Sequence, residues 1–175
     1  MKTYSRTKIL AYSGLCVSIS TVLSLITVYR MPQGGSVTAC SMLFIALPAV
    51  WFGPAAGIAA GVARGLLDLV IKPEIYHPAQ VLLDYPLAFG VIGFAGFFGK
   101  YRYGLLSGFL VGAALRFAAS SLSGFIFFAA YAPEGVHPLL YSAGYNASYI
   151  LPEAVVTCII ISIPAVRTLL NKIPA

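Results

Sequence analysis

Six apolar runs, separated by short breaks rich in proline, glycine and charge, constrain the fold of this chain more than any other feature. The runs lie near residues 9–29, 39–53, 55–71, 79–99, 104–130 and 148–169. A helix crosses the hydrocarbon core in roughly 20 residues, so a chain of 175 residues holds about six spans. Only 9% of the residues are charged, against roughly 25% in soluble domains. The sequence therefore predicts an all-α membrane protein with six transmembrane helices, lipid as its main solvent, and residues 1–175 in a single integral domain.

Lysine and arginine gather on one side of the expected topology. With the N-terminus inside, the cytoplasmic segments hold Lys2, Arg6, Lys8, Lys100, Arg102, Arg167 and Lys172. The outer loops hold Arg30 and Lys72, while Arg64 and Arg116 fall inside spans. This positive-inside bias predicts an N-in, C-in orientation. The net charge of +6 thus indicates topology rather than nucleic-acid binding. Because no small-residue cleavage site follows the basic N-terminus, the first run is expected to be a retained span.

The acidic residues gather at the opposite side. Each lies in an outer loop or within about three helical turns of the outer face: Asp68, Glu74, Asp84, Glu134 and Glu153. A carboxylate inside a span costs about 2.5–3.5 kcal/mol and needs a partner or a function. One interpretation is internal pairing, of Arg64 with Asp68 one turn away, and of Asp84 or Glu153 with Arg116. The other is an outward-facing site for a ligand with donor or cationic groups, which the one-sided placement favours.

Aromatic and amide side chains join the acids at these outer ends. They are Tyr76, Tyr85, Phe128, Tyr131, Tyr141, Tyr145, Asn146 and Tyr149. Half or more of the tyrosines would suit an interfacial belt, but a belt needs neither Asn146 nor an Asp84-Tyr85 pair before a proline. Pro86 removes a backbone hydrogen bond inside its run, and freed carbonyls are tolerated beside protein or a wet cavity. Pro152 repeats this feature before Glu153. We expect a pocket roofed by two loops and floored by the last three runs.

Catalytic, nucleotide and metal sites are not expected. A glycine stripe precedes Lys100, formed by Gly90, Gly93, Gly96 and Gly99. It fails as a phosphate loop, because Phe94 stands at the position of the first glycine and Tyr101 replaces the required hydroxyl residue. Such a stripe favours close helix contact instead. The two histidines, His77 and His137, stand alone in loops without the clustering that metal ligands need.

Several segments, in order along nearly the whole chain, resemble the thiamin-specific S components of energy-coupling factor transporters. They are MPQGGSV at 31–37, HPAQVLLDY at 77–85, the SG and FF pairs within 123–128, YAPEG at 131–135 and the YS and YN pairs within 141–146. The resemblance implies a six-helix S component in a bacterial plasma membrane that captures a vitamin, thiamin first, from outside. It also implies a partner module of a transmembrane coupling protein and two ATPases. ATP hydrolysis would occur in those partners, with no cofactor on this chain.

The resemblance also assigns roles to residues. In the family an acidic residue followed by tyrosine contacts the ligand, and Asp84 and Tyr85 occupy those positions. Tyr141 and Asn146 match the ligand-binding tyrosine and asparagine. Phe128 lies where some members carry a stacking tryptophan. These five residues are the leading candidates for ligand contact.

Ser120, Arg116 and Glu153 complete the candidate set. Ser120 stands where the family has a ligand-contacting histidine, which opens the alternatives of pyridoxine or a hydroxymethylpyrimidine as ligand. The pair of Arg64 and Asp68 lies outside the family pattern. A membrane scaffold without a small-molecule ligand is the alternative of another class, and it predicts that the outer polar residues pair among themselves and leave no cavity. An autonomous ion carrier, active without partner subunits, is a third possibility.

Overall fold

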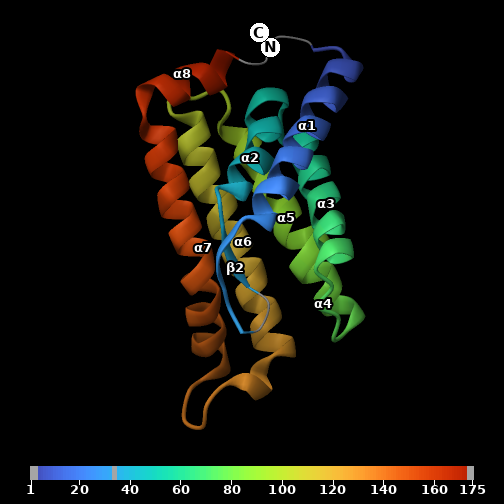
Figure 1. Cartoon of the computed structure of the whole chain (residues 1–175), viewed down its shortest axis with the longest axis vertical. Coiled ribbons are helices and arrows are strands. Elements are labelled where there is room, and N and C mark those ends of the chain that lie inside the picture. The colour runs from blue at the N-terminus through green and yellow to red at the C-terminus, as the bar shows by residue number, and fades with distance from the viewer. Residues whose placement is uncertain (1–3, 33–34, 173–175) are drawn as a thin grey trace.

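The chain forms a bundle of long helices with a short hairpin set into one side (Figure 1). The computed structural model describes residues 4–32 and 35–172. Its long helices are α1 (Arg6–Leu25), α3 (Pro54–Ile71), α6 (Gly104–Phe127) and α7 (Pro138–Ser162). A fifth rod is built from α4 (Pro78–Leu82), η1 (Leu83–Leu87), α5 (Ala88–Gly90) and η2 (Val91–Phe98). The shorter elements are β1 (Thr27–Arg30), β2 (Ser36–Thr38), α2 (Ser41–Phe52), η3 (Ala129–Tyr131) and α8 (Pro164–Lys172).

Five of these helical segments are long and apolar enough to cross a membrane: α1, α3, the Pro78–Phe98 rod, α6 and α7. The predicted multi-pass helical membrane protein is confirmed in this form. The second apolar run gives only the 12-residue helix α2, which is about 18 Å long. Nearly all of α2 between Ser41 and Ala49 is buried by the surrounding helices. Since its backbone faces protein rather than lipid, α2 does not need the length of a full span.

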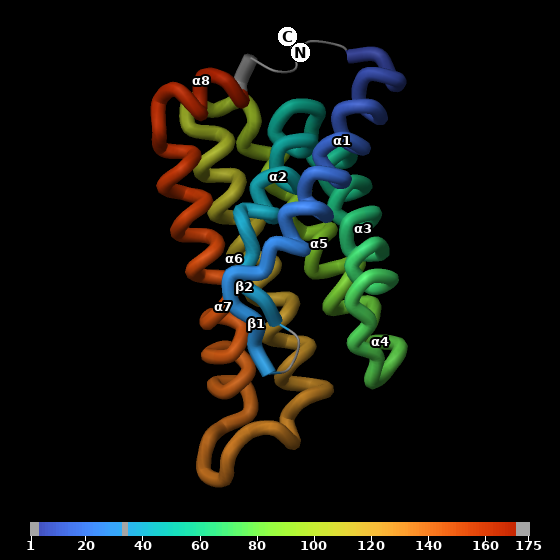
Figure 2. The backbone as a smooth tube through the Cα atoms, viewed as in Figure 1, coloured from blue at the N-terminus to red at the C-terminus, as the bar shows by residue number. Residues whose placement is uncertain are grey.

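A two-stranded hairpin, which the all-α prediction did not include, leads into α2. Strand β1 pairs antiparallel with β2, with Thr27 opposite Thr38 and Arg30 opposite Ser36. Figure 2 shows the hairpin in front of α6 and beside α7. The β-branched and aromatic residues of β1 favour strand geometry. Of the turn motif at 31–37, Gln33 and Gly34 lie outside the described residues, as do Lys2 at the N-terminus and the side chain of Lys172.

The glycine stripe of the fifth rod brings that rod against α2 and α3. The Cα of Gly93 stands against the backbone of Gly57 and Ile58, where any Cβ would overlap backbone atoms. Gly96 packs in the same way on the junction between α2 and α3. The expectation that this stripe serves close helix contact is confirmed.

Helix α7 begins ten residues earlier than the apolar pattern indicated, at Pro138, and ends at Ser162 rather than near residue 169. The prediction placed residues 131–147 in a loop because Ser142 and Asn146 lower the hydropathy there. Both side chains are buried against α6 instead of facing lipid. At the other end Pro164 breaks the run, and α8 turns across the end of the bundle (Figure 1). Pro152 lies inside α7 without interrupting it.

Candidate functional site

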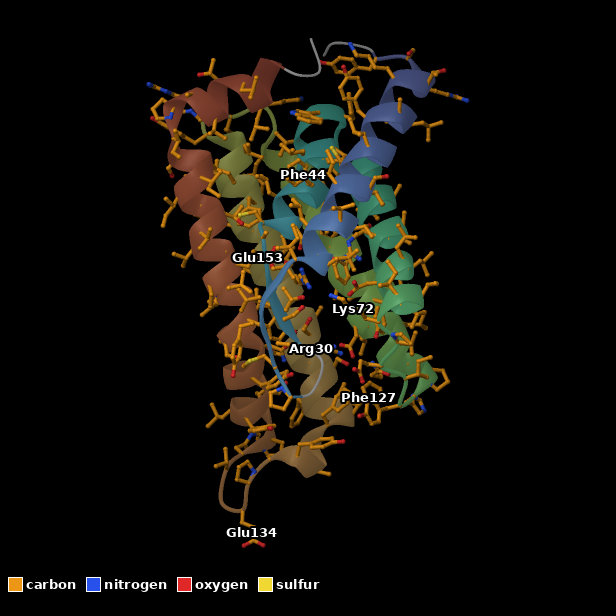
Figure 3. The ribbon with its side chains drawn as sticks, viewed as in Figure 1. Arg30, Phe44, Lys72, Phe127, Glu134 and Glu153 are labelled. Carbon is orange, nitrogen blue, oxygen red and sulfur yellow. The ribbon has the colours of Figure 1, made fainter. Side chains whose placement is uncertain are left out.

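A cavity of about 170 Å³ lies between the hairpin, α3, the fifth rod, α6 and α7. All eight residues selected from the sequence line it: Asp84, Tyr85, Arg116, Ser120, Phe128, Tyr141, Asn146 and Glu153. Figure 3 shows Arg30, Lys72 and Glu153 around this central space, whereas Glu134 lies at the far end of the bundle. The expected pocket is therefore present, although α3 and the hairpin contribute to it along with the last three runs. A scaffold without a cavity does not fit this structure.

Asp84 lies where the fifth rod widens. Pro86 has no amide hydrogen, and the chain forms a π-turn over Leu83–Leu87 instead of an α-turn. The Oδ2 atom of Asp84 accepts a hydrogen bond of 2.6 Å from Nε2 of Gln80, one turn earlier. Gln80 is only 1% exposed. Its Nε2 also donates to the carbonyl of Glu74, and its Oε1 accepts from the amide of Tyr76. The buried amide thus fixes one carboxylate oxygen of Asp84.

The hydroxyl of Tyr85 is hydrogen-bonded to the backbone. The phenol donates to the carbonyl of Lys72 at 2.8 Å and accepts from the amide of Glu74 at 2.8 Å. The ring is 5% exposed. Tyr85 therefore holds the loop between α3 and α4 in place and presents the ring, with its hydroxyl already engaged, to the cavity.

Asn146 joins α7 to α6. Its Nδ2 donates to the carbonyl of Ser142 at 2.9 Å and to the carbonyl of Ser120 at 3.3 Å. Its Oδ1 accepts from the hydroxyl of Tyr149. Ser142 adds a second link, donating to the carbonyl of Ser121 at 2.8 Å. Hydrogen bonds between α6 and α7 therefore hold the wall that carries Ser120 and Asn146. Tyr141 lines the cavity from the same helix as Asn146.

Glu153 is buried, with 4% of its surface exposed, and its carboxylate is fully engaged. It accepts from Thr38 Oγ1 at 2.6 Å, from Ser41 Oγ at 3.0 Å and from the amide of Met42 at 3.0 Å. Thr38 ends β2, whereas Ser41 and Met42 begin α2, where amides lack partners within the helix and negative charge is favourable. Glu153 thus caps α2 from α7.

Two arginines share one ring at the inner end of the cavity. The guanidinium carbons of Arg64 and Arg116 lie 5.1 and 4.2 Å from the centre of the Phe89 ring, which indicates cation–π contact. Arg64, 1% exposed, also pairs with Asp68 at 3.0 Å, so the expected pairing of these two residues is confirmed. In the described part of the chain, Arg116 forms no ion pair with Asp84 or Glu153. Pairing with an arginine inside the bundle, the alternative to a ligand site, therefore applies to Asp68 and not to Asp84.

Aromatic side chains form the outer end of the cavity. The Phe128 ring lies 4.8 Å from that of Tyr76 in an edge-on arrangement and 6.1 Å from that of Tyr131. The hydrogen bond with Tyr131 raises the pKa of the Tyr76 phenol, and the negative charge of Glu74 acts in the same direction. These rings supply the kind of apolar and π surface that stacks on a flat or cationic ligand.

The lining also includes residues that were not among the candidates, and Arg30, Gln80 and Tyr149 are three of them. Gln80 could have been found, because it precedes Asp84 by four residues and both face the same side of a helix. Arg30 gave no such signal, since it reaches the cavity through a hairpin that the apolar pattern does not predict. Tyr149 was expected near the outer face but had no assigned role.

The fold and the cavity define a multi-pass membrane protein that encloses a small polar space between its helices, as a solute-binding transporter subunit does. The chain belongs to the thiamine transporter protein (Thia_YuaJ) family, whose model matches residues 10–172. It is accordingly a transporter protein rather than an enzyme, and the resemblance of its sequence motifs to this family is confirmed.

Individual relatives agree with this membership. The thiamine transporter ThiT of Bacillus subtilis is 37% identical over 145 residues, which cover 75% of either chain. The ThiT of Lacticaseibacillus paracasei is 25% identical over 134 residues, or 67% of this chain and 63% of that protein. The solved structure of ThiT from Listeria monocytogenes superimposes with a TM-score of 0.80 at 28% identity, and the match covers 93% of this chain and 95% of that one.

Proposed function

We propose that this chain is the substrate-binding S component of an energy-coupling factor importer and that it captures thiamin at the outer face of a bacterial plasma membrane. The observation that carries the proposal is a carboxylate, Asp84, that lines a cavity without an ion-pair partner in the described part of the chain. Its position among aromatic rings suits an aminopyrimidine or a cationic ring. The relatives named ThiT support thiamin as the ligand.

The topology belongs to the same proposal. We place both termini in the cytoplasm and count α2, with the hairpin before it, as the sixth crossing of a single domain over residues 1–175. In this orientation the cavity opens outward and α8 lies at the inner surface. The lysine and arginine bias supports this orientation. A transmembrane coupling protein and two ATPases would then drive release of the vitamin inside.

The candidate residues have distinct roles in this proposal. Asp84 is the charged anchor, Phe128 stacks on the ligand, and Tyr141 forms part of the wall of the site. Asn146 and Tyr85 shape the site more than they bind ligand, since their polar atoms already have protein partners. Ser120, in place of the family histidine, leaves that wall with a smaller side chain.

A thermal-shift screen of the purified protein tests the ligand. Thiamin at a hundred times its dissociation constant should stabilise the folded state by about 2.7 kcal/mol, which corresponds to roughly 5–10 °C in a domain of this size. Pyridoxine and hydroxymethylpyrimidine at the same concentration should give smaller shifts. A larger shift with either one would reassign the substrate, and no shift with any of the three would contradict vitamin capture.

Gln80 should affect affinity through Asp84. Replacing Gln80 with leucine, which has similar bulk and no amide, removes the hydrogen bond to the Asp84 carboxylate and should weaken thiamin binding about tenfold. Titration calorimetry on the single and double variants would measure this. In an Asp84→Ala background the same change should have less than a threefold effect, because the group it positions is absent. Equal effects in both backgrounds would show that Gln80 acts independently of Asp84.

A further inference from the structure

A pair of arginines lies at the end of the bundle remote from the cavity mouth. Arg102 precedes α6 and Arg167 belongs to α8, yet both guanidinium groups contact the ring of Tyr103, at 5.5 and 5.0 Å from its centre. In the described part of the chain neither forms an ion pair. Four of the five acidic residues line the cavity, and Glu134 occupies the opposite end of the bundle (Figure 3). The described residues therefore place no acidic side chain against these two arginines.

An apolar groove on the outer surface of α6 and α7 leads toward this pair. Its lining includes Leu110 from α6 and Leu151, Val155, Cys158 and Ile159 from α7. The groove has a volume of about 510 Å³. Ser162, its polar member, satisfies its own hydroxyl by donating to the carbonyl of Cys158 at 2.7 Å. An apolar group in the groove would therefore leave no side-chain hydroxyl of the lining without a hydrogen-bond partner.

The length and position of the groove match one membrane leaflet. From Leu151 to Ser162 it extends about 16 Å along α7 at 1.5 Å per residue. This is about half of the 30 Å hydrocarbon core. Ser162 ends α7, and Arg167 follows five residues later in α8, which lies across the ends of α6 and α7 (Figure 1). The charged pair therefore lies at the headgroup end of the groove.

We propose that this face is a binding site for an anionic phospholipid, with the phosphate between Arg102 and Arg167 and one acyl chain in the groove of α6 and α7. The planar guanidinium group of arginine can donate two parallel hydrogen bonds to two oxygens of one phosphate. Tyr103 is suited to the interface, where aromatic rings with polar tips gather. Charge selects an anionic headgroup over a zwitterionic one, and the apolar groove selects a lipid over free phosphate.

Native mass spectrometry of the full chain in detergent tests the site. Phosphatidylglycerol should give at least five times more bound lipid than phosphatidylcholine at equal concentration. The double variant Arg102→Gln/Arg167→Gln should lower the phosphatidylglycerol adducts at least fivefold. Arg6→Gln is the matched control, since Arg6 is an exposed arginine in the first turn of α1 at the same end of the bundle. It should leave the adducts within a factor of 1.5.

A second variant tests the groove. Ile159→Trp should fill the groove and lower phosphatidylglycerol binding at least threefold, while the melting temperature of the variant confirms that it is folded. Inorganic phosphate at millimolar concentration should not displace the lipid. The site is refuted if the double arginine variant binds phosphatidylglycerol as the parent does, if Arg6→Gln loses as much, or if phosphate alone competes fully.

Discussion

Replacing Asp84 with asparagine is expected to weaken thiamin binding by at least tenfold and to leave the fold intact. Asparagine keeps the size of the side chain and an oxygen for Gln80, but it removes the negative charge. A hydrogen bond to a charged group contributes about 1.5–3 kcal/mol, or roughly ten- to a hundredfold in affinity. Partial shielding from water by the helices around the cavity strengthens this term. Isothermal titration of thiamin into the purified variant gives the measurement.

Glu134→Gln is the matched control for this charge. Glu134 is exposed in the loop before α7 and does not line the cavity, so its neutralisation should change the thiamin affinity by less than twofold. The Asp84 variant should melt within about 2 °C of the parent without ligand. Unchanged affinity in Asp84→Asn would remove the anchor from the proposed function. An equal loss in Glu134→Gln would mean that long-range charge, and not contact with Asp84, governs binding.

The membrane class and most of the helices could be predicted because lipid-facing segments must be apolar over about 20 residues, whatever their neighbours. The start of α7 could not be predicted in this way. Ser142 and Asn146 face α6 and the cavity, so they reduce the hydropathy of a segment that is nonetheless helical. The hairpin could not be predicted for another reason, because Thr27, Val28 and Tyr29 of β1 continue the first apolar run, which was interpreted as a single helix.

The residues that line the site could be predicted from the sequence, but the hydrogen bonds among them could not. Pro86 predicted a helix with a missing backbone hydrogen bond beside protein or a wet cavity, and the π-turn over Leu83–Leu87 lies at that place. Which polar groups remain available to a ligand depends on contacts between distant segments. Tyr85 and Glu153 were selected for their chemistry, yet their polar atoms are held by residues of other segments. Hydrophobicity and spacing contain no information about such partners.

Substitutions at Glu153 are expected to change the free energy of unfolding much more than the affinity for thiamin. Glu153→Ala removes the acceptor for three buried donors, the hydroxyl of Thr38 at the end of β2 and the hydroxyl of Ser41 and amide of Met42 at the start of α2. Leaving buried donors unsatisfied costs about 1–3 kcal/mol each, with incomplete additivity. We expect a loss of about 3 kcal/mol or more in the free energy of unfolding, or roughly 6–12 °C in melting temperature. Fluorescence of Trp51, the single tryptophan, would follow the transition.

Glu153→Gln distinguishes the cap from a ligand contact. The amide keeps one acceptor oxygen for α2 and loses the charge, so about half of the destabilisation should remain. If Glu153 acts only as the cap of α2, thiamin affinity of this folded variant should change by less than threefold, in contrast to Asp84→Asn. A tenfold loss of affinity with normal stability would assign Glu153 to the ligand instead. The two carboxylates line the same cavity, but only Glu153 has both oxygens engaged by hydrogen bonds from α2 and the hairpin, and this difference should divide their roles.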